Sequence, residues 1–95
     1  MQYLLLIHDN TLTTPSAEEW TDFCDRASAS GLFRGGSEVG ARQTLGGRGG
    51  VVSSAHIVGY MRFDADDKQA LLDLLATHPN LVHGGTVELC ELPKS

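Results

Sequence analysis

The stretch from His56 to Leu92 constrains the fold most, because it reads as a strand, a helix and a second strand in direct succession. Residues 56–63 are dense in apolar and β-branched side chains, and their alternation predicts a strand with one apolar and one mixed face. The apolar face holds Ile57, Gly59, Met61 and Phe63, and the mixed face holds His56, Val58, Tyr60 and Arg62. Residues 86–92 alternate again, with Val87 and Leu89 opposed to Glu88 and Cys90.

A helix is predicted between these two strands. Asp66, followed three residues later by Gln69, fits a capping box, and apolar residues then recur at helical spacing as far as His78. Pro79 cannot continue a helix, so we expect the helix to end at His78. A histidine in a last helical turn is favoured by the helix dipole and commonly serves as a cap.

The first half of the chain reads as a looser copy of the same unit. Residues 3–7 are apolar on both faces, which is typical of a strand that is covered on both sides. Ser16 and Glu19 make a second capping-box pattern, and Gly31 suits the C-terminal cap of the helix that follows. A further strand opens at residues 32–34, and Gly46–Gly50 is expected to form a mobile hairpin tip.

The predicted order is therefore β-α-β-β-α-β, a ferredoxin-like α+β fold in which two helices cover one face of a four-stranded antiparallel sheet. We expect residues 1–95 to form a single domain. A chain of this length can bury one hydrophobic core, but it is hardly long enough to enclose a deep active site within a single subunit as well. The uncovered sheet face would carry Leu4, Leu6, Val58 and Tyr60, which are too apolar to leave in water. A homodimer packed through these faces, as a dimeric α+β barrel, is the simplest expectation.

Composition and charge disfavour several function classes. The formal net charge is −5 and the basic residues are scattered, which disfavours nucleic acid or an anionic membrane as a partner. No apolar run approaches the roughly 20 residues that span a bilayer, and Met1–Ile7 lacks a basic region and a cleavage site. We therefore expect a cytoplasmic protein, in which Cys24 and Cys90, lacking CxxC spacing, are reduced and not joined.

The topology predicts that all four histidines of the chain meet at one edge of the sheet. His8 ends the first strand, His56 starts the third, His78 ends the second helix and His83 precedes the last strand. Convergent titratable groups of this kind can support acid-base chemistry. The candidate catalytic residues are His8, Asp9 and His56, and the candidate substrate-binding residues are Tyr60, Arg62, His78 and Glu88.

Each candidate also has a purely structural interpretation. His8 and His56 could simply face each other across an antiparallel pair, and Asp9 could only start a turn. His83, beside two glycines, is expected to lie in an exposed loop, where its removal would matter little. No histidine pair has the spacing that zinc sites use, and no Lys-Ser or Lys-Thr follows the glycine-rich run as in a phosphate loop. We therefore expect no metal and no cofactor.

Several short motifs resemble the YCII-related (DGPF-domain) family of the dimeric α+β barrel superfamily. They are Met1–Ile7, Gly31–Gly36, Gly59-Tyr60, Ala70 and the run from His78-Pro79 to Glu88. The resemblance implies a ferredoxin-like protomer and a homodimer, in a family where a few members act on small aromatic or lactone substrates and some use a His-Asp pair. The family's Asp-Gly-Pro-Phe signature is absent here, where Gly46–Ala55 takes its place, and residues 20–30 contain no histidine. The family's His-Asp pair therefore has no matching positions.

Two function classes follow from the sequence. The first is a small enzyme in which a neutral histidine acts as general base, oriented by Asp9, on a small organic substrate held between two sheets. The second is a non-catalytic dimeric module that binds a small molecule or a larger partner. A pH-rate profile, or a ligand in the mouth of the barrel, would separate them.

Overall fold

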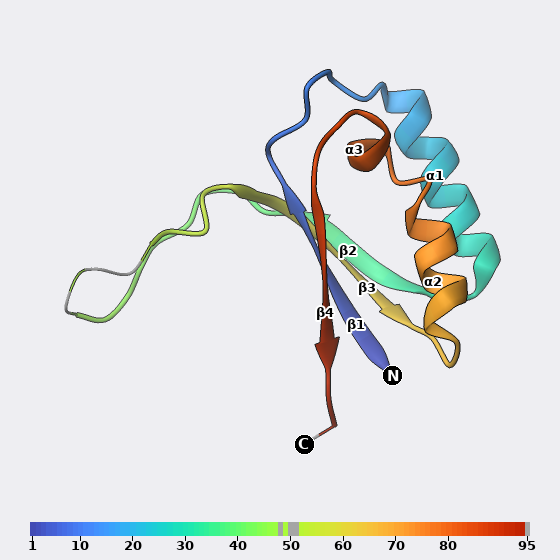
Figure 1. Ribbon diagram of the computed structural model, residues 1–95. Helices are drawn as coiled ribbons and strands as arrows, with labels where there is room; N and C mark the ends of the chain where they lie inside the picture. Colours follow the sequence, from blue (N-terminus) through green and yellow to red (C-terminus); the bar gives the residue numbers. More distant parts are fainter. Residues whose placement is uncertain (48, 50–51, 95) are drawn as a thin grey trace.

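The computed structural model describes residues 1–47, 49 and 52–94 as one antiparallel sheet with helices on a single face (Figure 1). The strands are β1 (Gln2–His8), β2 (Phe33–Glu38), β3 (Ile57–Asp64) and β4 (Val87–Leu92), in the order β2-β3-β1-β4. The helices are α1 (Ala17–Ser30), α2 (Lys68–Leu75) and the short α3 (Pro79–Val82). The predicted ferredoxin-like α+β architecture is confirmed.

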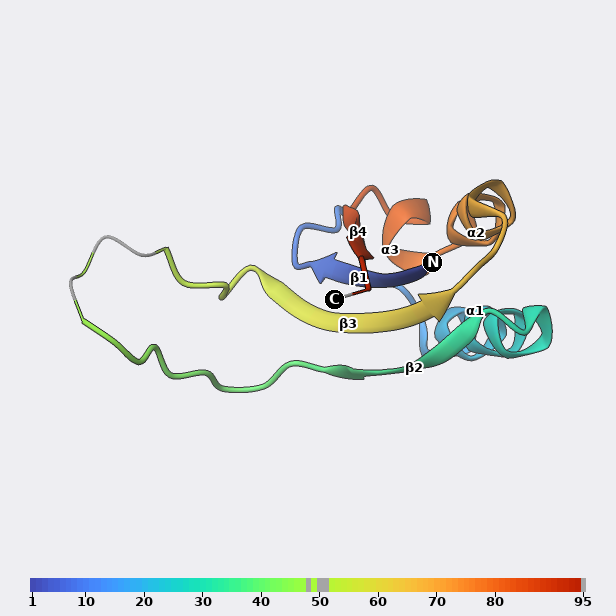
Figure 2. The ribbon, with the colours of Figure 1, turned by 90° about the horizontal axis from the view of Figure 1, so that it is seen from below.

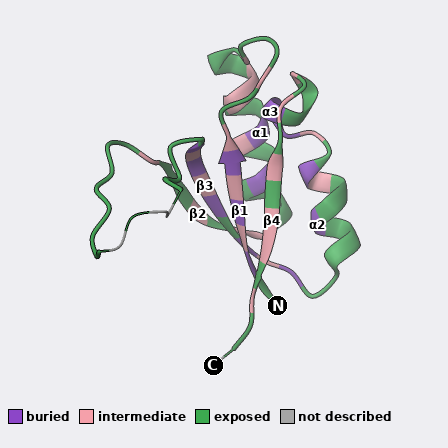
Figure 3. Cartoon of the chain, turned by 60° about the vertical axis from the view of Figure 1, so that its left-hand side comes forward, coloured by how far each residue is buried: buried purple, intermediate pink, exposed green. Residues whose placement is uncertain are grey.

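The core lies between the sheet and the helices (Figure 3). Side chains of one face of β1 and β3 are buried there, together with Phe23 and Ala27 of α1 and Leu71 and Leu75 of α2. The strand residues in this layer are Tyr3, Leu5, Ile7, Ile57, Met61 and Phe63. Their alternation matches the faces that the sequence predicts, because successive residues of a strand point to opposite sides of the sheet.

The opposite sheet face, here called the open face, is covered by none of the helices in the part of the chain that the structure describes. Leu4, Leu6 and Tyr60 lie there and are only partly buried, and Cys90 pairs with Leu4 on the same face. Val58, which was predicted to share this face, is left unpaired by a bulge in the β1–β3 ladder and packs against the core instead. Coverage of this face by a second copy of the chain stays a prediction.

The caps of α1 are those that the sequence predicts. Ser16 accepts from the N–H of Glu19 while the Glu19 side chain accepts from the N–H of Ser16, which closes the capping box. Gly31 ends the helix in the left-handed region, at φ 76°, where a side chain would be strained.

The expected single helix through His78 is wrong. The helix begins after Asp67, one residue later than predicted, and α2 ends at Leu75. Pro79 disfavours helical geometry in the residue before it, so His78 is extended, at φ −61° and ψ 132°. Pro79 then starts the new turn α3 as its first residue, a position where a missing N–H costs nothing.

The connection between β2 and β3 projects from the body of the molecule as a long arm (Figure 2). Arg42 holds the two sides of its base together by donating hydrogen bonds to the carbonyls of Val39 on the β2 side and of Ser54 and Ile57 on the β3 side. The predicted mobile tip at Gly46–Gly50 falls partly on residues 48 and 50, which lie outside the described residues. Within the described ranges, no helix is long and apolar enough to cross a membrane.

Candidate functional site

His8 lies at the end of β1, where a bulge interrupts the pairing with β3. Ile7 pairs with Gly59, but His8 pairs with Ile57, so Val58 is the extra residue. Two backbone hydrogen bonds hold His8 in place: its N–H donates to Thr86 and its carbonyl accepts from the buried Asn80 amide. Bulges of this kind often re-aim a side chain beside an active site.

A carboxylate partner reaches His8 from the neighbouring strand. Glu88 pairs with Leu6, so it lies diagonally across from His8, within reach of a long side chain. The distance from His8 Nε2 to Glu88 Oε1 is 2.9 Å. Because an ionised carboxylate only accepts, Nε2 must carry the proton, and in the neutral ring Nδ1 is then an acceptor. Nδ1 has no hydrogen-bond partner among the described residues.

His56 is brought against His8, as the topology predicts. The ring centroids lie 5.2 Å apart, with the planes tilted by 47°. The carbonyl of His56 also accepts from the N–H of Asp9 at 2.8 Å, which ties the two strand ends together. Two imidazoles and one carboxylate therefore form a group on the open face, here called the His8 cluster (His8, His56 and Glu88).

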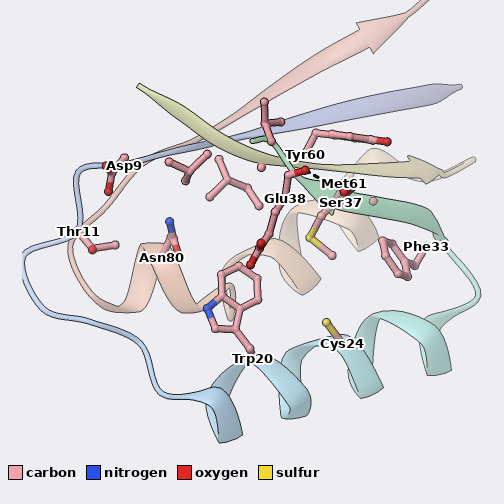
Figure 4. A pocket seen from close by; sticks show the side chains of 15 residues that line it. Asp9, Thr11, Trp20, Cys24, Phe33, Ser37, Glu38, Tyr60, Met61 and Asn80 are labelled. Carbon is pink, nitrogen blue, oxygen red and sulfur yellow. Dashed lines mark hydrogen bonds between the residues drawn. The ribbon is translucent and has the colours of Figure 1, made fainter. Parts of the chain in front are cut away.

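Asp9 does not orient His8. The carboxylate bonded to the His8 ring belongs to Glu88, whereas Asp9 lies among the residues that line a cavity on the helix side of the sheet (Figure 4). Asp9 and His8 are consecutive residues, and their side chains are directed to different sides of the chain end. The prediction that Asp9 orients His8 was therefore wrong, because the carboxylate in contact with the His8 ring is that of Glu88. The catalytic roles of His8, Asp9 and His56 and the substrate-binding role of Glu88 stay predictions.

Tyr60 and Arg62 alternate with the buried residues of β3, and both lie on the open face. Tyr60 is half-buried and pairs with Leu6, while Arg62 is exposed and pairs with Leu4. Both thus share a face with the His8 cluster, and a substrate-binding role for them stays a prediction.

His78 does not join the other histidines. It is fully buried on the helix side, with its ring centroid 5.0 Å from that of Trp20 and 4.8 Å from that of Phe23. Its Nδ1 accepts from the N–H of Asn80, so His78 is the N-cap of α3, and its Nε2 is buried without a partner among the described residues. Burial lowers the pKa of His78 to about 4, so it stays neutral at ordinary pH. The predicted place of His78 beside the other histidines at the sheet edge was therefore wrong, and its substrate-binding role stays a prediction.

His83 is not a free loop residue. Its Nε2 lies 2.6 Å from Glu19 Oε2, and its Nδ1 lies 2.6 Å from the hydroxyl of Thr13. Hydrogen bonds from the Ser16 N–H and from the His83 ring hold the pKa of Glu19 below its ordinary value. His83 therefore links the β1–α1 loop to the start of α1, and the expectation of a single cluster of four histidines is corrected to the pair His8 and His56.

A cavity of about 620 Å³, which no sequence pattern predicted, lies between α1 and the β2–β3 half of the sheet (Figure 4). The sheet positions that face it include Gly36, in register with Met61, and Gly59, in register with Glu38. The two glycines thus lie diagonally across from each other on adjacent strands, each paired with a residue that has a side chain. Among the described residues as a whole, the His8 cluster included, no group of three or more His, Cys, Asp or Glu residues is arranged to hold a metal ion.

Comparison with known proteins identifies the fold and no more. No protein-family model matches the chain, and no curated protein matches it in sequence. Among solved structures it is similar to a 5-chloro-2-hydroxyhydroquinone dehydrochlorinase from Burkholderia phenoliruptrix AC1100, in complex with 2,5-dihydroxybenzoquinone. The TM-score is 0.57 at 12% sequence identity, over 100% of this chain and 96% of that one. At this identity the likeness supports a shared α+β fold.

Proposed function

We propose that this protein is a small enzyme in which His8 acts as general base on a small hydroxylated aromatic or lactone-like molecule. The observation that carries the proposal is the 2.9 Å contact of Glu88 with His8 Nε2, which fixes the tautomer and leaves Nδ1 to accept a proton. The likeness in fold to a dehydrochlorinase that is seen with a hydroxylated quinone supports the choice of substrate class. The short sequence motifs support placing the chain among YCII-related proteins.

The chemistry that we propose is proton abstraction. His8 Nδ1 takes a proton from the substrate, and the electron pair left behind shifts a double bond or expels a leaving group such as chloride. Glu88 stabilises the imidazolium that forms, as a carboxylate does beside a catalytic histidine. His56, whose ring lies 5.2 Å from that of His8, is close enough to receive or return a proton through one water.

A second copy of the chain completes the site in this proposal. The His8 cluster lies on the open face, beside partly buried Leu6 and Tyr60, and none of the described helices packs on that face. Two sheets packed face to face would exclude water from the space between them, where electrostatic effects are stronger. The two free cysteines suit a cytoplasmic location, where thiols stay reduced.

Solvent-deuterium incorporation and chloride release test this function, with a chlorinated hydroxyhydroquinone and an unsaturated lactone as probes. For any probe that the wild type converts, His8→Gln should lower the turnover rate by roughly 10²-fold or more, the usual contribution of a general base. Glu88→Gln should slow it at least about tenfold, because the amide no longer fixes the tautomer. Glu91→Gln, on the same strand but outside the cluster, is the matched control. Unchanged rates in His8→Gln would refute the proposal, and a lack of turnover of every probe would favour the binding module.

A further inference from the structure

A threonine and a glutamate near the start of the chain are linked by hydrogen bonds to a histidine near its end. The distance from Thr13 Oγ1 to His83 Nδ1 is 2.6 Å, and the distance from His83 Nε2 to Glu19 Oε2 is also 2.6 Å. They come from the β1–α1 loop, the start of α1 and the end of α3, which lie together at one end of the molecule (Figure 1). This set, here called the Thr13 group (Thr13, Glu19 and His83), shares no residue with the His8 cluster and does not depend on the function proposed above.

The directions of these hydrogen bonds follow from the charge of Glu19. Hydrogen bonds from the Ser16 N–H and from the His83 ring keep the pKa of Glu19 below its ordinary value, so its carboxyl group is ionised at neutral pH. An ionised carboxylate only accepts, which places the ring proton of His83 on Nε2. In the neutral ring Nδ1 is then an acceptor, and the Thr13 hydroxyl must donate to it. The hydroxyl proton of Thr13 is therefore directed at a base that a carboxylate orients.

Backbone contacts hold the Thr13 group in place. Glu19 Oε1 accepts from the Ser16 N–H at 3.1 Å as part of the capping box, so that Oε2 is the oxygen that meets His83. The carbonyl of His83 accepts from the N–H of Leu12 at 2.9 Å, which ties the residue before Thr13 directly to His83. A hydroxyl within hydrogen-bond reach of a base, and a base oriented by a third group, is the arrangement that activates a nucleophile.

The surroundings of the Thr13 group are open to solvent and partly apolar. Thr13 itself is exposed, and the residues that precede Thr13 and His83 in the chain, Leu12 and Val82, are 85% and 64% exposed. Leu12 lies against Gly84, where an added Cβ would come within 2.8 Å of Leu12 Cδ1. A molecule in solution can therefore reach the hydroxyl, and the apolar side chains beside it favour a molecule that is uncharged and partly apolar.

We propose that Thr13 is a nucleophile that accepts the acyl group of an uncharged aryl ester, with His83 as general base and Glu19 as the residue that positions His83. Thr13 Oγ1 bonds to the acyl carbon while its proton passes to His83 Nδ1, and Glu19 stabilises the imidazolium that forms. The bond from the acyl carbon to the aryl oxygen breaks, and the departing oxygen keeps the electron pair and takes the proton from His83. Water then attacks the acyl group on Thr13, with His83 again as base, which releases the carboxylic acid and restores the hydroxyl.

The probe for this reaction is p-nitrophenyl acetate, whose leaving group is coloured. In the wild type, release of nitrophenolate should accompany acetylation of Thr13, which mass spectrometry of the acid-quenched protein and its peptides locates. Thr13→Val should lower the release rate by roughly tenfold or more, because it keeps the shape of the side chain and removes the nucleophile. Thr13→Ser should retain most of the rate, since it keeps the hydroxyl. Thr14→Val, at the next exposed threonine, is the matched control and should leave the rate unchanged.

A second pair of variants tests the carboxylate. Glu19→Gln keeps the capping box, which accepts glutamine at this position, but should lower kcat by roughly tenfold at unchanged KM, because the amide no longer fixes the tautomer of His83. Glu18→Gln, at an exposed glutamate of the same helical turn, is its control. Acetyl groups on other residues with none on Thr13, equal rates in the wild type and in Thr13→Val, or no release above the buffer blank would overturn the proposal. The deuterium and chloride assays report on the His8 cluster instead, so either proposal can fail without the other.

Discussion

Acidification should destabilise this protein through His78. The ring is fully buried between Trp20 and Phe23 and makes one hydrogen bond, as an acceptor from the Asn80 N–H. Protonation would place a cation in this apolar layer and would remove the acceptor that caps α3. The pKa of His78 is therefore lowered from 6.5 to about 4 in the folded state.

The direction of the effect follows from proton binding. Between pH 6.5 and about pH 4 the unfolded chain binds a proton at His78 that the folded chain does not. The free energy of unfolding therefore rises with pH across this window, and stability is lost as the pH falls through it. At about 1.4 kcal/mol for each pH unit, the full interval corresponds to roughly 3 kcal/mol. That is a large share of the about 5–15 kcal/mol by which domains are usually stable.

Urea unfolding followed by circular dichroism from pH 7 to pH 4, at one protein concentration, measures this loss. His78→Phe removes the titration but also the cap, so it should be less stable at pH 7 and should lose roughly 3 kcal/mol less than the wild type on acidification. The carboxylates titrate in both proteins, so their contribution cancels when the acid loss of His78→Phe is subtracted from that of the wild type. His56→Gln, which removes an exposed histidine, is the control and should keep the acid loss. Equal acid losses in the wild type and in His78→Phe would refute this account of His78.

Four further predictions follow from the same structure. The protein should be a homodimer that packs through its open faces. Light scattering that gives a 10.2 kDa monomer at micromolar concentration would contradict the dimer and with it the dimeric barrel. Cys24 lines the helix-side cavity and Cys90 lies on the open face, so the two thiols should stay separate, and the mass of the intact protein should not change on reduction. His83→Ala should lower the melting temperature by several degrees, since it removes the contacts to Thr13 and Glu19, whereas an unchanged melting temperature would support the exposed-loop interpretation. His8→Gln should change the free energy of unfolding by no more than about 0.5 kcal/mol in denaturation experiments, because a strand-end histidine contributes little to the core.

The fold could be predicted because its signals are local. Strand alternation and the capping box at Ser16 depend on residues close together in the chain, and each pattern matches one structure. The helix before Pro79 was extended too far, because the apolar spacing through His78 holds whether that residue ends one helix or caps the next. The same spacing nevertheless placed His78 on the apolar side of the predicted helix, and His78 does lie in the core.

The site was harder to predict because it depends on register. Topology places His8 beside His56, but choosing between Asp9 and Glu88 as the partner of His8 requires knowing that Glu88 pairs with Leu6. The close approach of β2 to β3 at Gly36, where a side chain would collide with the Tyr60 carbonyl, depends on the bulge between Phe33 and Gly36. A sequence pattern does not fix either pairing.

Nitrogen-detected NMR of the His8 ring tests whether His8 is paired with Glu88. At a pH where the ring is neutral, His8 should carry its proton on Nε2, and Glu88→Gln should change the nitrogen shifts of the His8 ring. The His56 signals should move as well, because the two rings lie 5.2 Å apart. A His8 ring protonated on Nδ1, or ring nitrogen shifts that are the same in the wild type and in Glu88→Gln, would contradict the pairing of His8 with Glu88.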